Sequence, residues 1–173
     1  MPDAPGLELI ANEVREKVAA DAVVGTAYHR EQACLEVAPG RVADVLAYLK
    51  TAPDHEYDFL ASVHGCDYLP DVPRLGVHYE LLNMRRVERL RVKTRVDVDD
   101  ARVPTVVELF PTAEFQEREV YDMFGVVFDG HPDMRRILMP EDYEGYPQRR
   151  DFPLGGEPVL FTHNEPEAPG WYE

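Results

Sequence analysis

The sequence predicts a mixed α+β domain followed by an extended, proline-rich arm. Apolar residues recur at helical spacing near the amino terminus, between residues 7 and 18. Two later segments, residues 75–81 and 90–98, alternate apolar and polar positions as half-buried strands do. Seven of the fifteen prolines follow residue 125, and prolines at that frequency interrupt helices and central strands. We therefore expect a folded domain over residues 1–125 and an arm over residues 126–173.

The amino-terminal third is expected to supply two helices and three strands. The first helix carries its apolar face on Leu7, Ile10, Ala11, Val14 and Val18. Residues 23–29 and 33–37 have the composition of two short strands joined by a short connection. A second helix is expected between Pro39 and Pro53. Residues 59–63 form the third strand of this region.

The clearest strand signal is a hairpin in the middle of the chain. Its second strand has apolar or small residues at Leu90, Val92, Thr94, Val96 and Val98, with Arg89, Arg91, Lys93 and Arg95 between them. One face is thus apolar and the other cationic, which fixes the register because a slip of one residue would bury four cations. The cationic face is expected to be solvated or paired with acids of the same chain. A further hypothesis is that an acidic surface of a partner docks on this cationic face.

Two more helices are expected before the arm. Pro104 starts a short helix that ends at Phe110. Thr112 is a suitable N-cap and Gly125 a suitable C-terminal stop for a second helix over residues 113–124.

Charge and composition exclude several functions. The formal net charge of −15 opposes nucleic-acid binding and docking on anionic lipid. The longest runs without a charged residue are eight residues long, whereas a spanning helix needs about twenty apolar residues. The amino terminus resembles no signal peptide. Two cysteines, Cys34 and Cys66, cannot supply the four thiolates of an iron–sulfur cluster, and no nucleotide-binding loop is present in the sequence.

An acidic cluster on the 113–124 helix is the first candidate for chemistry. It consists of Glu117, Arg118, Glu119 and Asp122. Glu114 and Asp122 lie four residues on either side of Arg118, so helical ion pairs are available. A carboxylate here can be read as a general base, but no nucleophile accompanies it. We favour pairing on the helix surface or with an arginine of a partner.

His131-Pro132-Asp133, with Glu141-Asp142 after it, lacks the spacing of a metal site, so a hydrogen-bonded turn histidine is the better interpretation. The pairs Arg135-Arg136 and Arg149-Arg150 stand among acids, which favours protein contacts over anion binding.

Aromatic and other apolar residues recur along the arm. They are Phe124, Met134, Ile137, Leu138, Met139, Tyr143, Tyr146, Phe152 and Tyr172. One interpretation is that these side chains fold back onto the domain. We favour the other, in which they fill pockets on a neighbouring protein, because such residues are enriched at interfaces.

The run from Glu117-Arg118-Glu119 to Pro153, which includes Gly-His-Pro-Asp-Met-Arg-Arg-Ile-Leu-Met-Pro-Glu-Asp, strongly resembles the signature of the C subunit of NADH:quinone oxidoreductase, respiratory complex I. The resemblance extends over residues 56–154 and includes Leu-Arg-Val-Lys-Thr-Arg-Val at 90–96 and Val-Pro-Thr-Val at 103–106. Phe110 stands where the family often has tryptophan.

The resemblance implies an α+β domain with a largely antiparallel sheet and flanking helices, followed by an arm that wraps the D subunit of the complex. It implies a non-catalytic structural and assembly subunit of the peripheral arm, which supports the D subunit near the quinone site of a proton-translocating enzyme. No cofactor is expected on this chain; NADH, FMN, iron–sulfur clusters and quinone would be bound by other subunits. The location implied is the cytoplasmic side of the cell membrane, held peripherally through neighbouring subunits.

We expect the following residues to form the interface: Glu117, Arg118, Glu119, Tyr121, Asp122, Phe124, His131, Pro132, Arg135, Arg136, Met139, Pro140, Tyr146, Arg149, Arg150 and Asp151. No catalytic, cofactor-binding or metal residue is assigned. Three alternatives stay open. The first is the equivalent subunit of a related complex, either a ferredoxin- or deazaflavin-dependent quinone reductase or a membrane hydrogenase. The second is a soluble acid–base or metal enzyme built on Glu117, Glu119, Asp122 and His131. The third is a free-standing acidic adaptor.

Overall fold

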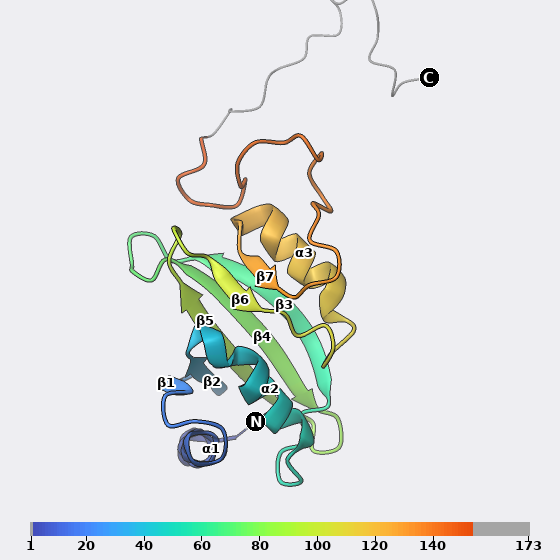
Figure 1. The fold of residues 1–173 in the computed structure, drawn as a ribbon. Helices are drawn as coiled ribbons and strands as arrows, with labels where there is room; N and C mark the ends of the chain where they lie inside the picture. The colour runs from blue at the N-terminus through green and yellow to red at the C-terminus, as the bar shows by residue number, and fades with distance from the viewer. Residues whose placement is uncertain (1, 154–173) are drawn as a thin grey trace, which may run out of the picture.

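A five-stranded sheet forms the centre of the computed structural model, which describes residues 2–153 (Figure 1). Its strands are β1 (Val23–His29), β2 (Gln32–Val37), β3 (Phe59–Asp67), β4 (Leu75–Asn83) and β5 (Glu88–Val96). They lie in the order β1-β2-β5-β4-β3, and every neighbouring pair is antiparallel except β2 with β5. The predicted α+β fold with a largely antiparallel sheet is confirmed. Residues 154–173 of the predicted arm, Tyr172 among them, lie outside the described residues.

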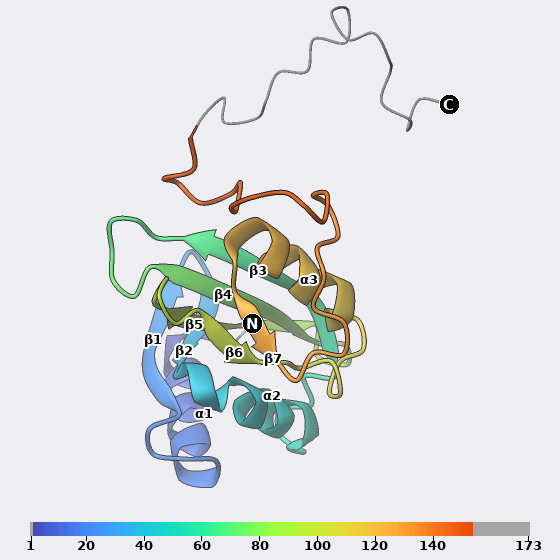
Figure 2. The ribbon, with the colours of Figure 1, turned by 45° about the horizontal axis from the view of Figure 1, so that its top comes forward.

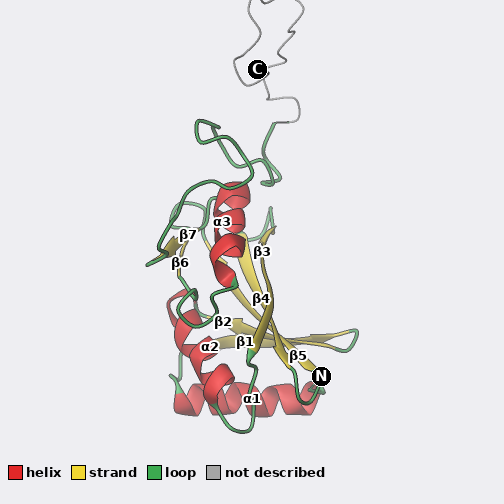
Figure 3. Cartoon of the chain, turned by 90° about the vertical axis from the view of Figure 1, so that its right-hand side faces the viewer, coloured by secondary structure: helices red, strands yellow, loops and turns green. Residues whose placement is uncertain are grey.

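Three helices share one core with the sheet. They are α1 (Ala4–Lys17), α2 (Val42–Thr51, after a 3-10 turn at Pro39–Arg41) and α3 (Ala113–Phe124). Figure 3 shows the sheet from its side, with α3 against one of its faces. Asp3 caps α1 by accepting a hydrogen bond from the Gly6 amide at 2.8 Å. The helices predicted at residues 7–18, after Pro39 and over 113–124 are confirmed.

The β4–β5 hairpin carries the predicted alternation. Leu90, Val92, Thr94 and Val96 are buried, whereas Arg91, Lys93 and Arg95 are half-buried on the opposite face. Three of these cations pair inside the chain: Arg91 with Glu80, Lys93 with Glu36 and Arg95 with Asp71. Internal pairing therefore accounts for most of the charge of this face.

One predicted helix is wrong. Arg102–Pro104 forms strand β6, which pairs in parallel with β7 (Val127–Asp129), and the following residues make a turn (Figure 2). The Thr105 amide donates to the Asp129 carbonyl at 2.9 Å, and the Val106 amide donates to the buried Glu117 carboxylate at 2.8 Å. These two amides are used in contacts distant in sequence, which no local pattern reveals. The first residues of the predicted arm thus belong to a strand of the domain.

Among residues 2–153, no helix has the length and apolar character needed to cross a bilayer.

Candidate functional site

The end of α3 and the chain that follows it form the candidate site. After β7, residues 131–153 run without helix or strand past α3 and the β3–β4 loop (Figure 2). We call residues 131–153 the docked segment. Gly125 ends α3 with φ +79°, the left-handed conformation that the sequence predicted there. This turn reverses the chain and directs it into β7.

Asp122 is the main anchor of the docked segment. One carboxylate oxygen, Oδ2, accepts hydrogen bonds from three consecutive amides: Ile137 at 3.0 Å, Leu138 at 2.7 Å and Met139 at 2.8 Å. The other oxygen, Oδ1, accepts from Arg136 Nη1 at 2.6 Å. Burial raises the pKa of Asp122, but the bonds from Met139, Arg136 and the other two amides outweigh it, so the net pKa is lowered. The carboxylate is therefore ionised and fully used.

Arginine side chains hold the same stretch through its carbonyl oxygens. Arg118 donates to the carbonyls of Arg135 and Arg136, both at 3.0 Å. Arg136 in turn donates through Nη2 to the Gly145 carbonyl at 2.9 Å. The ion pairs expected along the helix are replaced by contacts with the docked segment, including one between Arg118 and Asp133 at 3.7 Å. Guanidinium forks suit such paired carbonyls.

A second anchor lies at the carboxyl end of α3. Arg149 Nε donates to the Phe124 carbonyl at 2.7 Å, and its guanidinium lies 4.4 Å from the centre of the Tyr146 ring. The backbone of Gly125 faces both side chains, because a Cβ there would stand 2.5 Å from Tyr146 and 2.6 Å from Arg149. Glycine is thus required for close packing as well as for its positive φ.

A third anchor joins the docked segment to the β3–β4 loop. Arg74 binds Asp67 through Nε at 2.8 Å and Nη2 at 2.6 Å, and binds Asp151 through Nη1 at 2.8 Å. The Arg150 amide donates to Asp67 Oδ2 at 2.8 Å, and its side chain reaches the Leu69 carbonyl at 2.9 Å. The Arg74 bonds, with those from Arg150 and Leu69, outweigh burial and hold the pKa of Asp67 far below its usual range.

The side chains of Glu117 and His131 are also engaged in hydrogen bonds within the chain. Glu117 accepts from the Thr105 hydroxyl at 2.5 Å and from the Val106 amide at 2.8 Å. His131 Nε2 donates to the Glu114 carbonyl at 3.0 Å, and Nδ1 accepts from an amide at 3.0 Å, which assigns the neutral tautomer. His131 Nε2 stands 4.0 Å from Glu117 Oε2. Burial raises the pKa of Glu117.

The structure distributes the predicted interface residues over three levels of exposure. Buried are Glu117, Asp122 and Phe124; half-buried are Arg118, Tyr121, His131, Arg136, Met139, Tyr146 and Arg149; exposed are Glu119, Pro132, Arg135, Pro140, Arg150 and Asp151. The expectation that the acidic cluster pairs on the helix surface or with an arginine of a partner is wrong for Glu117 and Asp122. Both are buried against their own chain: Glu117 holds the turn after β6, and Asp122 holds the docked segment.

Several apolar residues of the predicted arm fold back. Phe124 is buried in the core, and Met134 and Met139 pack against it. Within the docked segment, Ile137 and Leu138 are the large hydrophobic side chains that stay exposed. Sequence reasoning missed Asp67, Arg74 and Thr105 as anchors, since each contacts a residue distant in the sequence.

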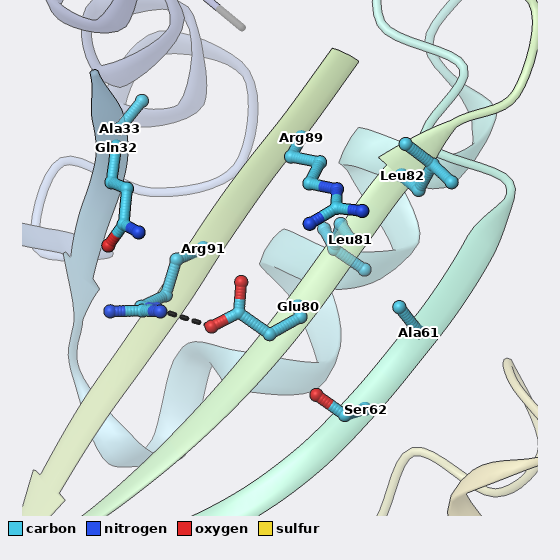
Figure 4. Close-up of a pocket in the computed structure, with 9 residues that line it drawn as sticks. All are labelled: Gln32, Ala33, Ala61, Ser62, Glu80, Leu81, Leu82, Arg89 and Arg91. Atoms are coloured by element: carbon cyan, nitrogen blue, oxygen red, sulfur yellow. Dashed lines mark hydrogen bonds and ion pairs between the residues drawn. The ribbon is translucent and has the colours of Figure 1, made fainter. Parts of the chain in front are cut away.

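A hollow on the open face of the sheet has no reactive arrangement of side chains. It has a volume of about 340 Å³, and Arg91 and Glu80 pair across its floor (Figure 4). Ser62 stands 3.4 Å from His64 at this face, but Glu80 is engaged by Arg91 and so does not orient the imidazole. Among the described residues, no group of three His, Cys, Asp or Glu side chains has the arrangement of a metal site.

Comparisons with known proteins point to one family. The family model described as respiratory-chain NADH dehydrogenase, 30 Kd subunit, matches residues 35–158. The C subunit of NADH-quinone oxidoreductase from Saccharopolyspora erythraea is 44% identical over 167 residues, which is 96% of this chain and 66% of the relative. The protein of the same name from Roseiflexus sp. is 43% identical over 145 residues, 84% of this chain and 83% of the relative.

Two solved structures are similar to this chain in both fold and sequence. A trypsin-resistant fragment of Nqo5 is 34% identical with a TM-score of 0.59, covering 73% of this chain and 98% of the fragment. A chain of the membrane-bound sulfane sulfur reductase, an archaeal respiratory membrane complex, is 30% identical with a TM-score of 0.67 and 85% coverage of both chains.

Proposed function

Since the chain belongs to the family of the 30 kDa subunit of respiratory-chain NADH dehydrogenase, which is the C subunit of NADH-quinone oxidoreductase, we propose that it is a non-catalytic assembly subunit. It supports the D subunit near the quinone site, in the peripheral arm of a proton-translocating enzyme. It lies on the cytoplasmic side of the membrane and is held there through neighbouring subunits.

One observation supports a structural role over an enzymatic one. The groups that an acid–base mechanism would need are engaged in bonds that shape the chain: Asp122 binds three amides and an arginine, Glu117 binds Thr105 and Val106, and both His131 nitrogens are occupied. A general base needs a free lone pair within reach of substrate. Glu119 is the exposed carboxylate of this cluster.

The thiols support the proposal that electron-transfer cofactors belong to other subunits. Metal and cluster ligation requires the thiolate. Burial raises the pKa of Cys34 to about 11, which keeps that thiol protonated at neutral pH. Cys66 is half-buried, and both cysteines are free. Iron–sulfur clusters are therefore proposed to bind elsewhere in the assembly, and we propose the same for NADH, FMN and quinone.

The experiment is purification of the tagged chain from detergent-solubilised membranes of its own host. We expect it to migrate in a large complex that reduces quinone with NADH. A truncation after Gly130 keeps β7, which pairs with β6, while removing the docked segment. That variant should retain its far-ultraviolet circular dichroism and be lost from the complex. Recovery of the full-length chain alone, as a monodisperse soluble protein, would contradict the proposal.

A related complex is the second candidate, because the same fold occurs in the sulfane sulfur reductase structure. Ferredoxin- or deazaflavin-dependent quinone reductases and membrane hydrogenases are other assemblies of this kind. The electron donor accepted by the purified complex separates these candidates from an NADH-dependent enzyme.

A further inference from the structure

The docked segment presents two neighbouring large apolar side chains to solvent, and Leu138 is the more exposed of them. Leu138 is 61% exposed, and its neighbour Ile137 is 37% exposed. We propose that Leu138 is the central contact of this chain with its partner in the complex, where it enters an apolar pocket with a basic rim. This inference rests on the proposed assembly function and names the residue and the partner chemistry that carry it.

Leu138 stands on the most firmly held stretch of the docked segment. The amide of Leu138 and those on either side of it bind a single oxygen of Asp122 at 2.7–3.0 Å. Arg136, which precedes this stretch, is fixed to the same carboxylate and to the Gly145 carbonyl. Ordering a flexible backbone on binding costs conformational entropy. Here that cost is met before binding, and pre-organisation of this kind increases affinity.

The sequence that follows Leu138 is acidic, which favours a basic partner surface. Exposed Glu141, Asp142 and Glu144 follow it closely in the sequence. The exposed Arg135, three residues before Leu138, is already bonded to Asp133 at 2.6 Å and lies 4.0 Å from Glu141, so Asp142 and Glu144 stay as the acids available to a partner. A complementary surface therefore has lysine or arginine around an apolar pocket, because like charges across an interface are unfavourable.

The same charge argues against other occupants. A second copy of this chain, with a net charge of −15, would bring an identical acidic rim against the first. An anionic lipid surface would be repelled likewise. An apolar anchor in a pocket, surrounded by polar contacts, is the usual organisation of an interface hot spot.

Leu9 supplies a matched control. It is also a leucine and is 65% exposed, but it lies on α1, whereas Leu138 lies on the docked segment. Leu138→Asp and Leu9→Asp therefore make the same chemical change at nearly the same exposure. Neither substitution removes buried surface from the core.

The first experiment measures assembly in the native host, with each full-length variant replacing the original chain. We expect Leu138→Asp to lower the fraction of the chain in the membrane complex by roughly tenfold or more, and Leu9→Asp to leave it unchanged. Leu138→Met should retain assembly. Deuterium exchange of the amides at 137–139 in purified Leu138→Asp must match that of the unmodified chain, which excludes local unfolding as the cause.

Assembly of Leu138→Asp at the level of the unmodified chain would overturn the inference. If the truncation after Gly130 still failed to assemble, the proposed function would stand and only the role of Leu138 would fall. If the unmodified chain were absent from any complex, the proposed function itself would fail.

The second experiment identifies the pocket. A photo-crosslinking amino acid at position 138, compared with one at position 9, is activated in intact membranes and the adducts are sequenced. We expect an adduct only from position 138, to an apolar peptide flanked by lysine or arginine in another polypeptide. An adduct to lipid, to a second copy of this chain or to an acidic surface would overturn the assignment.

Discussion

Replacing Asp122 with alanine tests the anchor on which the docked segment depends. The substitution removes four hydrogen bonds, three from amides and one from Arg136, all to one buried carboxylate. Bonds to charged groups contribute about 1.5–3 kcal/mol each, so a simple sum over the four is about 6–12 kcal/mol. The sum is an upper bound, because three of the bonds share one oxygen and contributions of neighbours do not add.

Local release of the docked segment limits the loss of global stability further. Once the docked segment leaves α3, its amides bind water, and the sheet and helices keep their own core. We therefore expect the global free energy of unfolding to fall by only about 1–3 kcal/mol, while the free energy of local opening falls by about 3 kcal/mol. That local change corresponds to roughly hundredfold faster exchange of the amides at 137–139.

Hydrogen–deuterium exchange resolved to single amides is the assay, with urea unfolding alongside it. Asp122→Asn is the comparison, since its amide oxygen still accepts from the three backbone amides while its NH₂ group faces the donor Nη1 of Arg136. We expect intermediate exchange for this variant. Unchanged protection at 137–139 in Asp122→Ala would refute the anchor, whatever the effect on global stability.

Three further predictions concern the other parts of the site. Gly125→Ala should destabilise the chain by at least about 1–2 kcal/mol, measured by thermal unfolding, because φ is +79° and the new Cβ meets Tyr146 at 2.5 Å. Glu117→Gln should equal or exceed the unmodified chain in stability at pH 8, and the difference should vanish near pH 4. The reason is that burial raises the pKa of Glu117, so stability is lost as the carboxyl group ionises with rising pH. Urea unfolding followed by circular dichroism at the two pH values measures this difference. Asp67 has a pKa lowered by its bonds to Arg74, so its contribution is present above about pH 4 and is lost as pH falls below that value. Proteolysis of the docked segment should then accelerate. Asp67→Asn should weaken this pH dependence, and the remainder comes from Asp122 and Asp151, whose pKa values are lowered as well.

The elements predicted correctly are those with a local signal. The α1 helix and the β4–β5 hairpin each show their period within about a dozen residues, and Gly125 identified the end of α3 by its conformational freedom. The β6 strand was mistaken for a helix because its partner, β7, lies more than twenty residues later. A parallel pair of three residues each leaves no periodic trace.

The sequence indicated which residues take part in polar contacts at the candidate site, but only partly which groups they contact. The acidic cluster and the arginine pairs were recognised as binding groups, but their partners proved to be atoms of the same chain, such as Asp122 for Arg136 and the Phe124 carbonyl for Arg149. Nothing in the spacing of the sequence connects Asp67 to Arg150, which are more than eighty residues apart. Ionic composition alone does not distinguish an intramolecular anchor from an intermolecular contact.

This distinction changes where recognition should be sought. A buried charge is costly unless it is paired, and Asp122 and Arg136 meet that condition within the chain. Their substitution therefore acts on a partner indirectly, through the backbone that they hold. The groups left for direct contact are those not used internally, chiefly Leu138 and, among the acids that follow it, Asp142 and Glu144. If this division is correct, Asp122→Ala and Leu138→Asp should both reduce assembly, but only the first should change amide exchange in the chain alone.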